Sequence, residues 1–100
     1  MKIKLNGKEY DFRVTGTVGL MYMAERTLGE AYDHTKKYHV MALYHSCLVA
    51  SNRGREVPDL TEFMASLTTG AVAEMGEYFW SEWERLEGAS APKEDGQGEG

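Results

Sequence analysis

The sequence predicts an α+β fold: an N-terminal β-hairpin, then three to four helices, then a disordered C-terminal tail. Three observations lead to this prediction. Asn6-Gly7, the preferred pair of a two-residue hairpin turn, separates two short stretches in which apolar and charged residues alternate. Apolar residues then recur at three- and four-residue steps, which is the spacing of one helix face. From Ala89 onward only small, polar and charged residues remain.

The register of the hairpin follows from hydropathy and charge together. With residues 1–5 and 8–14 as strands around the turn, Ile3 faces Tyr10 on a largely apolar face. The other face pairs lysines with acids, namely Lys4 with Glu9 and Lys2 with Asp11. A lone hairpin leaves two open strand edges, so we expect pairing with another chain to cover them.

Four helical segments are predicted after the hairpin. They run to about Leu28, over about 36–51, over about 60–67 and over about 71–87. The second is the most apolar and is expected to be central. Side chains that can cap the N-termini are Thr15 or Thr17, Asp33 or Thr35, Asp59, and Thr68 or Thr69. Asp59 with Glu62 resembles a capping box. Gly29 and Gly88 are the expected ends of the first and last helices.

Composition predicts one folded domain over residues 1–88. The tail, residues 89–100, carries no large apolar side chain and cannot bury enough surface to offset its chain entropy. The net charge of -5 argues against binding to nucleic acid or to an anionic membrane. No apolar run approaches the ~20 residues of a membrane span, and no signal-peptide core is present at the N-terminus. The single Cys47 fits a reducing compartment, so we expect a cytoplasmic protein.

Side chains that could support catalysis or metal binding are few. His34, His39 and His45 lack the four-residue step of helical zinc sites, so no metal and no other cofactor is expected. A catalytic pair of Cys47 with His39 or His45 is conceivable, but Cys47 occupies an apolar helix position, where free cysteine acts as a small hydrophobe. No enzymatic activity is expected. The basic clusters are interpreted as solvated helix-flanking charge: Lys36-Lys37 and Arg53-Gly54-Arg55.

Methionine and aromatic side chains are abundant for a small acidic protein. The chain has six Met, six Tyr, three Phe and two Trp, and such residues either fill a small core or form adaptable surfaces that bind other chains. The last helix carries a wide apolar arc with the candidate partner-binding residues Met75, Phe79, Trp80 and Trp83. Trp80 lies furthest from the centre of this arc. The glutamates of this helix, Glu74, Glu77, Glu82, Glu84 and Glu87, are interpreted as its solvated face.

The order of these elements resembles a known family. The opening Lys4-Leu5-Asn6-Gly7-Lys8-Glu9-Tyr10 is similar to the hairpin of small phage tail assembly chaperones. A helix with Gly19, Glu25 and Gly29 follows, and later a Leu60-Thr61-Glu62-Phe63 helix start. The resemblance covers roughly residues 1–87, ahead of a loose acidic tail.

The resemblance implies a non-enzymatic protein of a long-tailed phage or prophage, acting in the cytoplasm of the bacterial host. Such chaperones bind the long, helical, aggregation-prone tape measure protein before the tail tube polymerises around it. We also expect self-association into a homo-oligomer. Two alternatives stay open. One is a small structural tail or head–tail component that remains in the particle, and the other is a minor enzyme or metal protein that uses His45 and Cys47.

Overall fold

The N-terminal hairpin consists of β1 (Lys2–Leu5) and β2 (Lys8–Asp11). In the computed structural model, which describes residues 1–90, the two strands are antiparallel with Ile3 opposite Tyr10. Asn6 and Gly7 have φ angles of 52° and 80°, because a type I′ turn needs positive φ at both central residues. The predicted turn and register are therefore confirmed.

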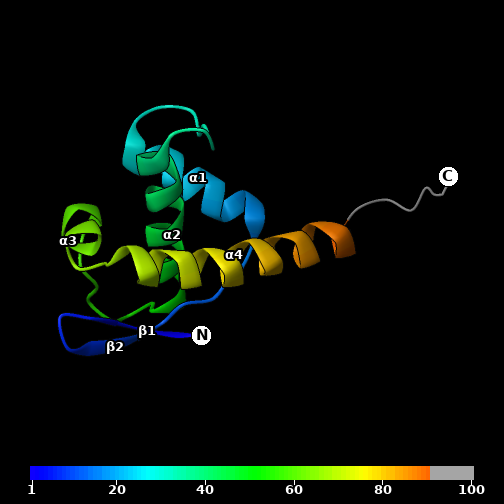
Figure 1. Cartoon of the computed structure of the whole chain (residues 1–100). Helices are drawn as coiled ribbons and strands as arrows, with labels where there is room; N and C mark the ends of the chain where they lie inside the picture. The colour runs from blue at the N-terminus through cyan, green and yellow to red at the C-terminus, as the bar shows by residue number, and fades with distance from the viewer. Residues whose placement is uncertain (91–100) are drawn as a thin grey trace, which may run out of the picture.

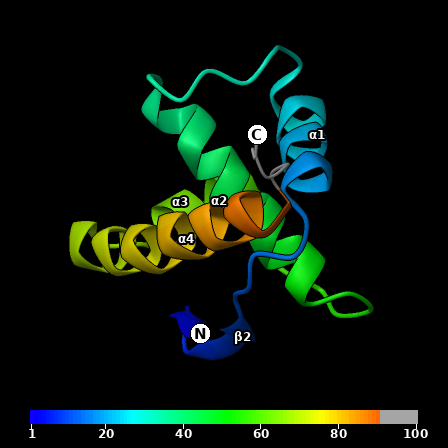
Figure 2. The same cartoon turned by 90° about the vertical axis from the view of Figure 1, so that its right-hand side faces the viewer.

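Four helices follow the hairpin, as the α+β prediction requires. They are α1 (Thr17–Leu28), α2 (Lys37–Ser51), α3 (Leu60–Ala65) and α4 (Thr69–Ser90). The long α4 crosses α2, and the hairpin lies at the C-terminal end of α2 (Figure 1). The connection between α1 and α2 lies at the opposite end of α2, away from the hairpin (Figure 2). Helix α2 is therefore the central element that the other segments contact.

The first two helices begin differently from the prediction. Gly16 is the N-cap residue of α1, in extended backbone and with no side-chain cap, so neither predicted threonine caps this helix. Lys36 is the N-cap residue of α2, and it too has extended backbone and no side-chain cap. The Asp33 carboxylate instead accepts hydrogen bonds from the backbone N–H and the hydroxyl of Thr35, at 3.0 and 2.7 Å. These two side chains close a turn before the helix and do not cap it.

The last two helices begin as predicted, but α4 ends later. The Asp59 carboxylate accepts the N–H of Glu62 at 2.9 Å, and the Thr68 hydroxyl accepts the N–H of Ala71 at 3.1 Å. Helix α4 passes through Gly88 and reaches Ser90, so the predicted end at Gly88 is wrong. A glycine within a helix costs only about 1 kcal/mol relative to alanine and does not by itself end the helix. The rest of the predicted tail, 91–100, lies outside the described residues.

The hydrophobic core joins the hairpin, α2 and α4. Phe12, just after β2, is fully buried and packs edge-on against Tyr44 of α2 with ring centroids 6.2 Å apart. Tyr44 in turn contacts Phe79 of α4 at 5.0 Å. Most of the side chains of α2 from Ala42 to Leu48 are buried, which confirms the predicted central position of this helix. Within the described residues, no helix is long and apolar enough to cross a membrane.

Side chains that follow or end α2 occupy the outer edge of β2. Asn52 is nearly buried and bonds both backbone groups of Asp11, at 3.1 Å for the N–H and 2.8 Å for the C=O. Side chains also bond the backbone at two neighbouring positions, Ser51 with Arg13 and Arg55 with Glu9. The prediction of two open strand edges is therefore wrong for β2. The outward backbone groups of Lys2 and Lys4 on β1 have no such partner among residues 1–88.

Candidate partner-binding groove

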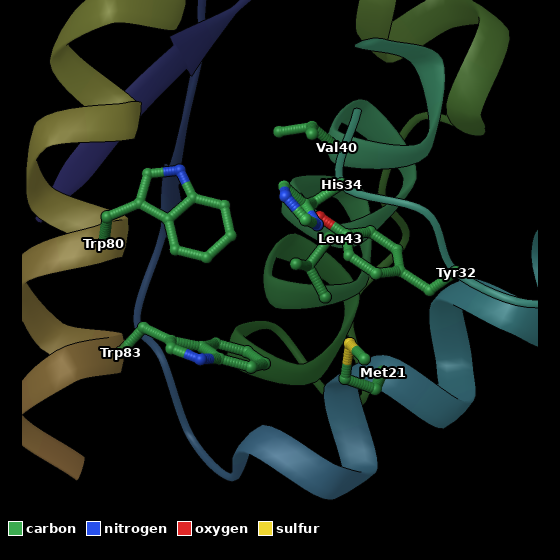
Figure 3. A pocket seen from close by; sticks show the side chains of 7 residues that line it. All are labelled: Met21, Tyr32, His34, Val40, Leu43, Trp80 and Trp83. Atoms are coloured by element: carbon green, nitrogen blue, oxygen red, sulfur yellow. The ribbon is translucent and has the colours of Figure 1, made fainter. Parts of the chain in front are cut away.

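An open apolar hollow of about 680 Å³ lies between α4 and the pair α1–α2. Figure 3 shows the two tryptophans of α4 on one side, across from side chains of α1, α2 and the loop between them. The hollow is lined by Met21, Tyr32, His34, Val40, Leu43, Trp80 and Trp83. Five of these residues lie on helices and contribute apolar or aromatic side chains to the hollow. We call this hollow the tryptophan groove.

Trp80 is fixed in place although it is partly exposed. Its indole N–H donates to the Tyr44 hydroxyl at 3.1 Å, and its ring meets Phe79 edge-on at 4.7 Å. Burial raises the pKa of Tyr44, so this phenol stays neutral at physiological pH. Gly76 makes room for the hydroxyl, because a Cβ there would lie only 3.1 Å from it. Trp80 is therefore 36% exposed although its contacts hold the ring in one position.

The four residues predicted to bind a partner divide into two pairs. Trp83 stacks on Phe79 at 5.3 Å and lies 5.9 Å from Trp80, so both tryptophans line the groove. Phe79 and Met75 are 0% and 1% exposed and belong to the core. Neither core side chain offers surface to a partner in this conformation. The Phe79 ring contacts both tryptophans and supports them from the core side.

The opposite wall includes the loop between α1 and α2, which hydrogen bonds hold in place. Glu25 of α1 accepts the backbone N–H of Tyr32 at 2.9 Å. The fully buried His39 accepts the N–H of Asp33 through Nδ1 at 2.9 Å, so its Nε2 carries the proton and donates to Glu30 at 2.6 Å. These three hydrogen bonds to side chains of α1 and α2 hold the loop in place. Tyr32 therefore faces the tryptophans from the other side of the groove.

Sequence reasoning identified only two of the seven lining residues, Trp80 and Trp83, as partner-binding residues. Tyr32 and His34 come from a segment that reads as a polar loop, and no periodicity marks them. Val40 and Leu43 follow the apolar pattern of α2, and this pattern is the same for core and groove positions. The only signal in the sequence was the excess width of the apolar arc on α4, which pointed to Met75, Phe79, Trp80 and Trp83 together.

The candidate catalytic pair is not arranged for catalysis. Cys47 is fully buried, and burial raises the pKa of its thiol to about 12. The thiol therefore stays protonated at neutral pH and is a poor nucleophile. His45 bonds the C=O of Pro58 through Nε2 at 2.7 Å. Within the described residues, no cluster of three or more His, Cys, Asp or Glu side chains could hold a metal ion.

We expect Cys47 to resist alkylation in the folded protein. Iodoacetamide requires an accessible thiolate, and here the thiol is both buried and protonated. Mass spectrometry should find the native chain unmodified at about pH 8, and fully modified once urea unfolds it. Rapid modification of the native chain would contradict this burial. Cys47→Ala, which removes only a small buried group, should retain partner binding.

Comparison with protein families, with curated proteins and with solved structures gives no match to this chain.

Proposed function

We propose that this chain is a non-enzymatic tail assembly chaperone of a long-tailed phage or prophage, and that it binds the tape measure protein in the host cytoplasm. The observation that carries the proposal is the tryptophan groove, an open apolar surface with two rigidly held tryptophans. Large aromatic side chains that are partly exposed and well supported are the usual centres of protein-binding sites. The sequence resemblance supplies the identity of the partner.

The groove suits a partner that is aggregation-prone before assembly. A long helical protein with an uncovered apolar face would precipitate unless other chains cover that face. One groove covers a short length of helix, so we propose that several copies of the chaperone bind along one tape measure protein. The expected homo-oligomer would place such grooves side by side and raise the effective concentration of binding sites.

A structural tail component would use the same groove but would stay in the finished particle. Purified tails distinguish the two functions, because a chaperone is absent from them and a structural component is present. The catalytic alternative has less support, since the thiol of Cys47 is buried and protonated.

We expect Trp80→Ala to weaken binding of the tape measure protein by about tenfold or more, as loss of a central tryptophan does at other interfaces. The protein is co-expressed with the tape measure protein of the same phage or prophage. The measurement is the fraction of tape measure protein that stays soluble and co-purifies. Far-UV circular dichroism checks that the variant remains folded.

Met64→Ala is the matched control. Met64 is 37% exposed, against 36% for Trp80, but it lies on α3 and does not line the groove. The control should keep the tape measure protein soluble as the unchanged chain does. The proposal fails if the unchanged chain neither binds the tape measure protein nor keeps it soluble. The site is wrong if both variants bind equally well.

A further inference from the structure

The tryptophan groove continues into a second hollow along α1. This second hollow, of about 440 Å³, is bordered again by Met21 and Trp83. It adds the exposed side chains of Val18 and Tyr22, which are 82% and 59% accessible. The two hollows together form one extended apolar surface between α1 and α4.

The border of this surface is mainly acidic, with one base nearby: the Arg26 guanidinium lies 5.8 Å from the centre of the Tyr22 ring. Glu25 and Glu87 line the second hollow, and among residues 1–90 no lysine or arginine lines either hollow. The Glu87 carboxylate accepts the Thr17 hydroxyl at 2.6 Å, which fixes a negative charge at the border. Among the described residues, neither glutamate forms an ion pair.

One further acid of α4 shares the face of Trp80: Glu84 stands four residues after it, and residues at this spacing are neighbours on a helix surface. Glu77, three residues before Trp80, borders a separate hollow together with Glu74 and Glu82. Arg85, the only base of α4 within the described residues, pairs with Glu82 at 2.7 Å. Both lie on another side of the helix, five and two positions from Trp80. The negative charge around the groove is therefore not neutralised by its own helix.

The walls of the groove favour a helical occupant over an extended one. Side chains of helices and of one loop form these walls, and no strand edge borders them. An extended segment would bury backbone N–H and C=O groups without partners, whereas a helix satisfies its own. The chain's own residues 91–100 do not fit, since they carry no large apolar side chain and include three acids and one lysine. A second copy would bring another net charge of -5.

We propose that the groove binds an amphipathic helix whose apolar face is flanked by lysine or arginine. The apolar face covers the tryptophans, and the basic side chains reach the border carboxylates with their charged ends in solvent. This inference rests on the proposed function, since it describes the chemistry of the partner segment that the same groove binds. It also predicts which part of a long helical partner is bound, namely a segment with basic flanks.

The test uses the full chain and two synthetic peptides. Both are helices of about 18 residues with the same leucine face, one flanked by lysine and the other by glutamate. Trp80 and Trp83 are the two tryptophans of the protein, so intrinsic fluorescence reports occupancy of the groove directly. We expect the lysine peptide to bind at least about tenfold more tightly, and raising salt from about 0.05 to about 0.5 M to reduce this difference.

Variants that replace a glutamate by glutamine show which carboxylates cause the preference for the lysine peptide. Glu87→Gln, at the border of the second hollow, should reduce the preference for the lysine peptide about threefold or more. Glu74→Gln is the matched control: it removes the same charge from α4 at a position six residues from Trp80, on another side of the helix. Equal binding of both peptides, or an equal effect of the control, would overturn the inference. So would fluorescence that changes with protein concentration alone, since a second copy would then occupy the groove.

The two proposals fail separately. If the lysine peptide is preferred but the tape measure protein is neither bound nor kept soluble, the groove chemistry stands and the proposed function falls. If the tape measure protein binds through Trp80 but the two peptides bind equally, only the prediction of basic residues beside the partner's apolar face is wrong.

Discussion

Phe79→Ala is expected to remove about 3 to 5 kcal/mol from the free energy of unfolding, the usual cost of truncating a buried phenylalanine. Phe79 is fully buried and its ring contacts Tyr44, Trp80 and Trp83 at centroid distances of 5.0, 4.7 and 5.3 Å. The alanine leaves a cavity at the point where α4 meets α2. Small domains have only about 5 to 15 kcal/mol in total, so the variant should be close to unfolding.

Urea unfolding followed by far-UV circular dichroism measures this loss. Phe79→Leu is the control, because it retains most of the apolar contact and should lose clearly less. Tryptophan fluorescence supplies a second readout, since both tryptophans pack on the Phe79 ring. An alanine variant as stable as the unchanged chain would show that this contact does not hold α4 in place.

Asn52→Asp is expected to destabilise the fold by about 3 kcal/mol at neutral pH, because a nearly buried group loses two donated hydrogen bonds and gains a charge. The Asn52 amide donates to the C=O of Asp11 at 2.8 Å and to the C=O of Leu48 at 2.7 Å. A carboxylate has the same shape but cannot donate, so it would face two carbonyl oxygens. The change therefore weakens the attachment of β2 to α2 without altering volume.

The sign of the pH dependence identifies the mechanism. The new carboxyl would have a raised pKa in the folded state, because burial and the carbonyl oxygens disfavour its charge. Its protonated form can donate again, so the deficit relative to the unchanged chain should shrink as pH falls through that raised pKa. Ser51→Ala, whose bonds to Arg13 are exposed, should cost about 1 kcal/mol or less. An Asn52→Asp deficit that is independent of pH would point to some cause other than the charge.

The hairpin was predictable from sequence because two independent constraints agree on one register. The Asn6-Gly7 turn fixes the pairing, and the apolar and charged faces demand the same pairing. The starts of α1 and α2 were not predictable in this way. Several capping residues stand near each start, and tertiary packing places the first turn of α1 after Gly16, which has no side chain to cap it. The start of α3 shows the opposite case, because Asp59 caps this helix as the sequence predicts.

The groove was only partly predictable. Periodicity on α4 marks Trp80 as lying outside the narrow core stripe, but it places Trp83 in that stripe together with Phe79, which is buried. The distinction depends on how α4 crosses α2, which is a property of the whole fold. Tyr32 reaches the groove through hydrogen bonds to α1 and α2, and no local pattern encodes such contacts.

Only one of the two strand edges of the hairpin is free for pairing. This limits how far a β-sheet can extend between copies of the chain. Asn52 and Arg55 already bond three of the four outward backbone groups of β2, namely both groups of Asp11 and the C=O of Glu9, and their side chains block this side from another strand. Within residues 1–88, only β1 offers an edge with free backbone groups. The hairpin can therefore pair with only one further strand. Pairing β1 with the β1 of a second copy would produce a four-stranded sheet that ends in an occupied β2 on both sides. Such an assembly stops at two chains, so strand pairing between copies cannot propagate into a fibre.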